Sequence, residues 1–298
     1  MLPRYEPRAF DVPEEVVNVV GYNDMRDWLE ALVPVFVAAH PGLRIKLDLP
    51  GTRFAPAALA KGDSAFAPMG AELTPPQLAQ YRAIAKADPI AFRVAHASLD
   101  SKALSGPLAV FVHRDNPLAS LTLDQASRVF SGEARHWGDV GLAGPWAARP
   151  IHPVGLAGGT ALSYAFHAGA MGARAFAPHL DGVPQSVEVV KKVGGDANAI
   201  GFAAAMRETP EVRVVPIAAR AGDAPVALTE ESILAGRYPL DRFLLVYVRL
   251  PVAPLVRDFL RLMLSREGQA AVAATPQRYL PLSAADATRE RDRLELLK

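Results

Sequence analysis

The sequence alternates short β-branched runs with helix-forming stretches, and this alternation limits the possible folds more than any other feature. The run 16–20 leads through the tight turn 21–24 into residues 25–40, where apolar side chains recur every three or four positions, as on one buried face of a helix. A second strand followed by a short helix is expected over residues 44–62. Alternation of this kind predicts an α/β fold with a largely parallel sheet covered by helices.

The pattern continues toward the end of the chain. No internal repeat, low-complexity tract or proline-rich linker interrupts it, so we expect two lobes joined by extended crossover strands that act as hinges. The further strands are expected at 64–69, 108–112, 152–156, near 200, at 212–217 and at 242–248, and the further helices from 74 onward and at 122–130, 160–168, 186–193, 254–264 and 266–274.

Composition and charge exclude several classes of protein. The chain has 298 residues, of which 50% are hydrophobic and 21% charged, as in a compact globular protein of one large domain or two lobes. The formal net charge of +1 provides no field that attracts nucleic acid, so no nucleic acid partner is expected. The absence of cysteine excludes disulfides, thiolate metal sites and a lipidated cysteine within this chain.

Catalytic and metal-binding patterns are missing from the sequence. The 7 histidines stand singly, without the i, i+4 spacing of a metal site, and no Gly-x-Ser-x-Gly nucleophile turn occurs. We therefore expect no metal, no cofactor and no enzymatic activity. Trp137 is expected to be a packed anchor of its loop.

Three turns between a strand and a helix are candidates for binding. They span residues 21–25, 51–54 and 157–163. A helix N-terminus in such a turn exposes unpaired N–H groups and about half a positive charge, which favours an anion. In an open α/β sheet these turns also lie at the carboxyl ends of the strands, where ligands bind.

Longer sequence blocks occur in the order typical of a known family. They are Asn116-Pro117-Leu118, Leu121-Thr122, Val129-Phe130-Ser131-Gly132-Glu133, Trp137-Gly138-Asp139-Val140-Gly141, Ala199-Ile200-Gly201-Phe202, Gly236-Arg237-Tyr238-Pro239-Leu240-Asp241-Arg242, Ser265-Arg266-Glu267-Gly268-Gln269 and Tyr279-Leu280-Pro281-Leu282. Together these blocks resemble the phosphate ABC-transporter substrate-binding (PstS-like) family. The resemblance implies a type II periplasmic-binding-protein-like fold of two lobes, each a mixed, mostly parallel sheet flanked by helices.

The resemblance also implies how the protein is organised and where it works. One lobe would comprise residues 1–105 plus 219–298 and the other residues 106–218, with a ligand cleft between them. A protein of this family captures a small anionic solute and hands it to the membrane permease of an ABC transporter. We accordingly expect an exported, periplasmic monomer whose signal peptide is not part of this chain.

The four turns that hold phosphate in this family depart here from the family pattern. The first turn, usually G-S-x-T-M, reads GYNDM at 21–25, and the second, usually G-S-G, reads GTR at 51–53. The third ends in Met69-Gly70 in place of Ser-Arg or Ser-Asp, and the fourth lacks its usual arginine. Carried over to these positions, the resemblance implies the following ligand-binding residues: Tyr22, Asn23, Asp24, Met25, Thr52, Arg53, Met69, Gly158, Gly159 and Thr160.

These departures leave the identity of the solute open. Dehydrating phosphate is costly, and binding proteins offset that cost with charge-assisted hydrogen bonds, whereas Arg53 is the only cation in the four turns. The predicted ligand is phosphate or another small anion, and a monoanion, a carboxylate or a partly apolar solute stays possible. In the last case Tyr22 and Met69 would add apolar wall to the pocket.

Three of these residues have a second interpretation. Asp24 either accepts a hydrogen bond from a protonated ligand or caps the helix that follows. Arg53 either contacts the anion or is solvated at the surface. Thr160 serves as a ligand donor, as a helix N-cap, or as both.

Two alternatives to a transport receptor stay open at this stage. A protein of the same fold that has lost phosphate binding, or binds a less polar solute, would serve as a periplasmic sensor or interaction protein. A hydrolase built on the same lobes would have to turn over a phosphoester.

Overall fold

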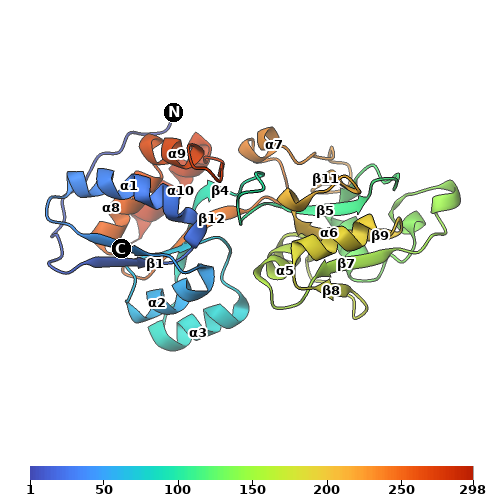
Figure 1. The fold of residues 1–298 in the computed structure, drawn as a ribbon, viewed down its shortest axis with the longest axis horizontal. Coiled ribbons are helices and arrows are strands. Elements are labelled where there is room, and N and C mark those ends of the chain that lie inside the picture. Colours follow the sequence, from blue (N-terminus) through green and yellow to red (C-terminus); the bar gives the residue numbers. More distant parts are fainter. Residues whose placement is uncertain (298) are drawn as a thin grey trace. The chain divides into compact units, whose positions relative to one another are not determined.

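The computed structural model describes residues 1–297, which form two compact units (Figure 1). Unit 1 contains Met1–Ser105 and the chain from Phe243 onward, and unit 2 contains Gly106–Arg242. The chain therefore crosses between the units twice, after Ser105 and after Arg242.

Residues 219–242 differ from the sequence-based assignment, because they belong by their contacts to unit 2 and not to the first lobe. Hydrogen bonds along the segment contribute to this. Val226 and Ile217 exchange two main-chain hydrogen bonds, the Tyr238 hydroxyl donates to the Leu108 carbonyl at 2.9 Å, and the Leu108 N–H donates to the Leu240 carbonyl at 3.0 Å. The second crossover thus lies at the start of strand β12, after the segment that we had placed in the first lobe.

Unit 1 is built from two small sheets covered by helices. Strands β1 (Val17–Val20) and β2 (Ile45–Asp48) pair in parallel, and β3 (Ala67–Met69), β12 (Phe243–Val248) and β4 (Ile90–His96) form an antiparallel sheet in that order. The helices are α1 (Arg26–Ala39), α2 (Ala55–Lys61), α3 (Pro75–Ala85), α8 (Pro254–Met263), α9 (Arg266–Ala273) and α10 (Ala284–Leu296).

Helix α1 forms where the sequence predicts a helix with one buried face. Trp28, Leu29, Leu32 and Phe36 are all buried, at the three- and four-residue spacing of one helical face. The Phe36 ring meets the ring of Phe259 on α8 edge to face, with 5.0 Å between centroids. This contact joins the first helix of the chain to one from its last quarter.

Unit 2 contains a five-stranded sheet in the order β10-β5-β9-β7-β8. Its strands are β5 (Leu108–His113), β7 (His152–Leu156), β8 (Asp181–Val183), β9 (Ala199–Ala204) and β10 (Val212–Val214), and a separate pair joins β6 (Leu121–Thr122) to β11 (Ile217–Ala218). The helices are α4 (Leu123–Phe130), α5 (Ala161–Phe166), which continues as a π-helical turn (His167–Met171), α6 (Ser186–Gly194) and α7 (Glu230–Leu234).

The core of unit 2 is aromatic. The rings of Phe166 and Phe202 stack with 3.9 Å between centroids, and Phe130 meets both edge to face. Gly155 on β7 makes room for this cluster, because a Cβ atom at that position would lie 2.5 Å from the Phe202 ring. The glycine is therefore required by packing.

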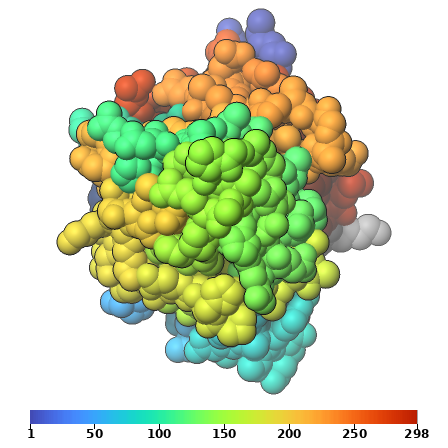
Figure 2. Space-filling model, turned by 90° about the vertical axis from the view of Figure 1, so that its right-hand side faces the viewer, coloured from blue at the N-terminus to red at the C-terminus, as the bar shows by residue number. Residues whose placement is uncertain are grey.

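A long loop between α4 and β7 covers one side of unit 2. Figure 2 shows it in light green, in the middle of the face turned to the viewer. Trp137 in this loop is fully buried and meets the ring of Trp146 edge to face, with 6.3 Å between centroids. The Arg149 guanidinium lies 3.9 Å from the centroid of the Trp146 ring. Trp137 is thus a packed loop anchor, as predicted.

The mixed α/β architecture is confirmed, although antiparallel pairs are more frequent than the sequence suggested. Parallel pairs join β1 to β2, β6 to β11, and β7 to both β8 and β9, but β3, β4, β5 and β10 pair antiparallel with a neighbour. The reason in unit 1 is that β4 precedes the first crossover and β12 follows the second, so the two strands run in opposite directions. Within residues 1–297, no helix is both long and apolar enough to cross a membrane.

Candidate functional site

The first three of the four turns that the family resemblance predicts to bind the ligand come together in unit 1. They follow the carboxyl ends of β1, β2 and β3. The Gly51 N–H donates to the Gly21 carbonyl at 2.9 Å, which joins the second turn to the first. The Tyr22 N–H donates to the Pro68 carbonyl at 2.9 Å, which joins the first turn to β3. Turns that are far apart in the sequence therefore form one surface, as their place at the carboxyl ends of neighbouring strands requires.

Thr52 contributes a side-chain hydroxyl to this surface. It begins the short 3₁₀ turn η2 (Thr52–Phe54), and its Oγ1 accepts a hydrogen bond from the Gly70 N–H at 3.2 Å. A hydroxyl group has one proton and two lone pairs, so this acceptor role leaves its proton available to a ligand. The N–H groups at the start of η2 also have no acceptor within the turn. Gly51 precedes it with a φ of 125°, a conformation that favours glycine.

Arg53 supplies positive charge beside Thr52. Its side chain is exposed, and its guanidinium carbon lies 4.6 Å from the centroid of the Phe54 ring. A cation over an aromatic face is attracted by the ring quadrupole, so Phe54 restrains the arginine near the turn. Phe54 itself is 42% exposed.

Three of the predicted ligand residues have side chains that are buried in the core of unit 1. Met25 and Met69 are fully buried, and Tyr22 is buried with its hydroxyl 2.9 Å from Ser105 Oγ. The Tyr22 ring lies directly over Gly70, where an added Cβ atom would be 2.4 Å from the ring. The apolar pocket wall that we expected from Tyr22 and Met69 is thus part of the core, because both side chains are buried there.

Asp24 does not cap the helix, contrary to one of the two interpretations from the sequence. The residues at the N-caps of η1 (Asn23–Met25) and α1 are Tyr22 and Met25, and neither cap has a side-chain hydrogen bond. The Asp24 carboxylate accepts the Leu104 N–H at 2.9 Å and a short hydrogen bond from the Tyr279 hydroxyl. Burial, with further contributions from Tyr22 and Asp24, raises the pKa of Tyr279 above its usual value, so this hydroxyl stays protonated and donates. Asn23 is exposed.

The fourth turn lies in unit 2, between β7 and α5. Gly158 and Gly159 are exposed, and Gly159 has a φ of 93°. Thr160 is the N-cap of α5: its Oγ1 accepts the Ser163 N–H at 3.1 Å and donates to the Ala157 carbonyl at 3.2 Å. The N-cap interpretation is confirmed, and since the cap occupies the Thr160 hydroxyl, the donors left to a ligand in this turn are main-chain N–H groups.

A groove of about 760 Å³ also lies in unit 2, but at the other end of β7. Its walls include His152, which begins β7, together with Asp196, Lys191 and Lys192. His152 Nδ1 lies 2.6 Å from the Asp196 carboxylate. Since Gly158–Thr160 follows the carboxyl end of β7, this groove is separate from the predicted anion turn.

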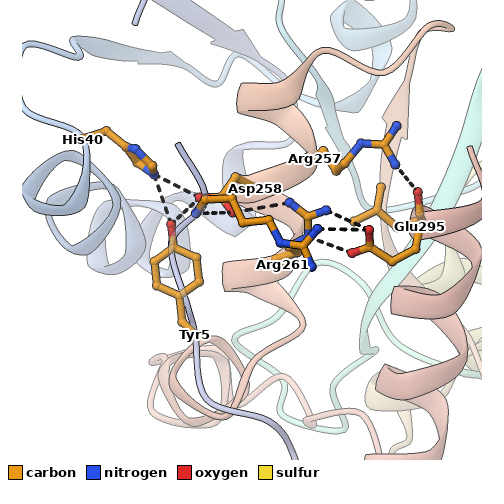
Figure 3. Close-up of polar contacts among 8 residues, drawn as sticks. Tyr5, His40, Arg257, Asp258, Arg261 and Glu295 are labelled. Atoms are coloured by element: carbon orange, nitrogen blue, oxygen red, sulfur yellow. Dashed lines mark hydrogen bonds and ion pairs between the residues drawn. The ribbon is translucent and has the colours of Figure 1, made fainter. Parts of the chain in front are cut away.

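A second polar cluster occupies the far end of α1 in unit 1 (Figure 3). The Asp258 carboxylate, fully buried on α8, accepts the Tyr5 hydroxyl at 2.7 Å and lies 2.9 Å from His40 Nε2. Next to it, Arg261 makes two hydrogen bonds of 2.8 Å to the Glu295 carboxylate on α10. The cluster joins the N-terminal segment to the C-terminal helices and lies at the opposite end of α1 from Asp24; a helix of 14 residues is about 21 Å long.

Sequence reasoning assigned no role at the site to Leu104, Ser105 or Tyr279. Tyr279 stands in one of the blocks that carry the family resemblance, so the signal was present, but its partner Asp24 lies 255 residues earlier. Leu104 and Ser105 carry no local pattern that marks them.

Comparisons with known proteins agree with this fold. Residues 21–267 match a family model described as a PBP superfamily domain. The chain is 31% identical over 295 residues to the phosphate-binding protein PstS of Pseudomonas aeruginosa, covering 95% of this chain and 87% of that protein.

Two solved structures share the fold. An ABC-type phosphate transport receptor from Vibrio cholerae superposes with a TM-score of 0.59 at 19% identity, covering 89% of this chain and 99% of the other. PstS from Borrelia burgdorferi also gives a TM-score of 0.59, at 16% identity, covering 91% of this chain and all of the other (100%).

Proposed function

The chain belongs to the PstS-like family of the PBP superfamily, and on this premise we propose that it is a solute-binding protein that captures orthophosphate or a similar small oxyanion for an ABC importer. The observation that carries the proposal is the hydroxyl of Thr52. Its oxygen accepts the Gly70 N–H, its proton is available to a ligand, and Arg53 stands next to it with a positive charge.

The remaining ligand contacts in this proposal come from main-chain groups. The first N–H groups of η1 and η2 in unit 1 and the Gly158–Thr160 turn in unit 2 supply donors that need no particular side chain. Helix N-termini, Thr52 and Arg53 would in this way replace the arginine missing from the fourth turn.

The proposed setting follows from the family. We propose a periplasmic monomer that passes its solute to a membrane permease, binds no nucleic acid and releases the solute chemically unchanged. Turnover of a phosphoester by the purified protein would contradict the last point.

Calorimetric titration of the phosphate-free protein with orthophosphate at neutral pH tests the proposal. We expect a dissociation constant in the micromolar range or tighter, and Thr52→Val should weaken it about 10-fold or more, since a hydrogen bond to a charged group contributes about 1.5–3 kcal/mol. Arg53→Ala should also weaken binding.

A matched control is Thr229→Val. Thr229 caps α7 in unit 2 through the Ser232 N–H, so its loss affects stability without removing a proposed ligand donor. No heat and no thermal shift with the unmodified protein would refute phosphate capture and favour a sensor or interaction protein of the same fold.

A further inference from the structure

The segment 277–280, between α9 and α10, has no part in the function proposed so far, although its last two residues begin one of the blocks typical of the family. Tyr279 in this segment is 1% exposed. Its hydroxyl donates to the Asp24 carboxylate of the first ligand turn and lies 3.4 Å from the Ser105 N–H, which donates to it. One buried hydroxyl thus joins the first ligand turn to the last residue of unit 1 before the first crossover.

Ser105 extends this connection to the third ligand turn. Its Oγ donates to the Gly70 carbonyl at 2.8 Å and lies 2.9 Å from the Tyr22 hydroxyl. Because the Ser105 proton is used on Gly70, the Tyr22 hydroxyl is the donor in the second contact. The neighbouring Leu104 N–H donates to Asp24. The chain therefore leaves unit 1 through residues that are bonded directly to the first and third turns.

The same segment also reaches the second crossover. The His96 N–H donates to the Leu280 carbonyl at 2.8 Å. His96 is paired with Phe243, the first residue of unit 1 after the chain returns, and their rings lie 4.8 Å apart. Tyr279 and Leu280 are consecutive, so a single short segment contacts the residues next to both crossovers.

Crossovers between two units are where hinge motions are absorbed, by a few residues that change their backbone angles. In this protein such a change at Leu104 or Ser105 would alter the hydrogen bonds to Tyr279 and Asp24, and through them the first turn. The hydroxyl of Tyr279 contacts both Asp24 of the first turn and Ser105 at the crossover.

We propose that Tyr279 is a positioning residue for solute capture, which couples the ligand turns of unit 1 to the crossover at Ser105. It touches no solute; it fixes Asp24 and Ser105 relative to each other and so sets the range of unit movement from which the solute is captured. The coupling to capture rests on the proposed function, whereas the restraint on the crossover does not.

The test compares Tyr279→Phe with Tyr5→Phe. Both changes remove one tyrosine hydroxyl bonded to a carboxylate in unit 1, but Tyr5 lies at the far end of α1 and contacts Asp258. Because the chain has no cysteine, Lys61→Cys in unit 1 and Lys191→Cys in unit 2, both exposed, allow one fluorophore to be placed on each unit. The distribution of distances between the labels is measured by single-molecule energy transfer, and orthophosphate affinity by calorimetry.

We expect Tyr279→Phe to broaden the distance distribution of the phosphate-free protein and to weaken orthophosphate binding about 10-fold, with Tyr5→Phe unchanged in both. The proposal is overturned if Tyr279→Phe and Tyr5→Phe give the same distance distribution. This holds even if Tyr279→Phe has the lower melting temperature. If the unmodified protein binds no orthophosphate, the proposed function fails, and the phosphate-free distances still decide the role of Tyr279.

Asp24→Ala provides a second variant in case Tyr279→Phe does not fold. It removes the carboxylate that accepts the Tyr279 hydroxyl and the Leu104 N–H, and it leaves the Tyr279 side chain in place. Broadening of the phosphate-free distance distribution in Asp24→Ala supports the proposal, and an unchanged distribution overturns it.

Discussion

Replacing Gly70 with alanine probes the link between the proposed ligand turns of unit 1 and the side chains buried beneath them. The added Cβ atom would lie 2.4 Å from two atoms of the Tyr22 ring and 2.6 Å from Ser105 Oγ, whereas ordinary contacts begin near 3.4 Å. The ring must therefore move by about 1 Å, away from a position fixed by its hydrogen bond to Ser105. Overpacking of this kind costs about 2 kcal/mol.

That cost should appear as a fall of about 4–8 °C in the melting temperature of unit 1, given its size. Thermal unfolding followed by circular dichroism measures it, with Gly195→Ala as the control, since an added Cβ atom there makes only ordinary contacts at 3.6 Å. Orthophosphate binding should weaken as well, because Gly70 also donates its N–H to Thr52.

A double-mutant cycle with Tyr22→Ala identifies the cause of the effect. If the ring is what the new Cβ atom meets, Gly70→Ala should cost less in the Tyr22→Ala background than in the unmodified protein. Two results would refute the reasoning. One is that the stability losses of Gly70→Ala and Tyr22→Ala simply add in the double mutant. The other is that the melting temperature of Gly70→Ala lies within about 1 °C of that of the unmodified protein.

Two further predictions concern the polar cluster shown in Figure 3. Asp258→Asn should lower the free energy of unfolding by about 3 kcal/mol in urea titrations, because it breaks a buried set of bonds to Tyr5 and His40; a loss no larger than that of the exposed control Asp48→Asn would contradict this. The hydrogen bond from Arg261 lowers the pKa of Glu295, so the stabilisation by this carboxylate is present above its unfolded pKa of about 4.3 and is lost as the pH falls through the lower folded value. Glu295→Gln should therefore reduce stability at neutral pH and make stability fall less steeply on acidification. Urea midpoints that depend on pH in the variant as steeply as in the unmodified protein would contradict this role of Glu295.

Local patterns in the sequence predicted the elements that frame the site. The buried face of α1, the β1 and β2 strands and the N-cap at Thr160 depend on residues only a few positions apart, and each was found where expected. The order of the family blocks predicted the two-unit fold.

Contacts between distant parts of the chain could not be predicted in this way. Asp24 looked like a helix cap because the residues around it suit one, but its carboxylate is bonded to Leu104 and Tyr279. The buried side chain of Tyr22 likewise depends on Gly70, a partner in another turn. Residues 219–242 were assigned to the wrong unit because no sequence pattern marks the hydrogen bonds of Tyr238 and Leu240 to Leu108.

A crystal structure of the protein with orthophosphate tests the central claim most directly, because it locates the anion. The account predicts a phosphate oxygen within hydrogen-bond distance of Thr52 Oγ1, about 2.5–3.0 Å, with the Arg53 guanidinium turned toward the anion. Phosphate bound elsewhere, for example beside Lys191 and Lys192 in the groove of unit 2, with the turn at Thr52 empty, would contradict it.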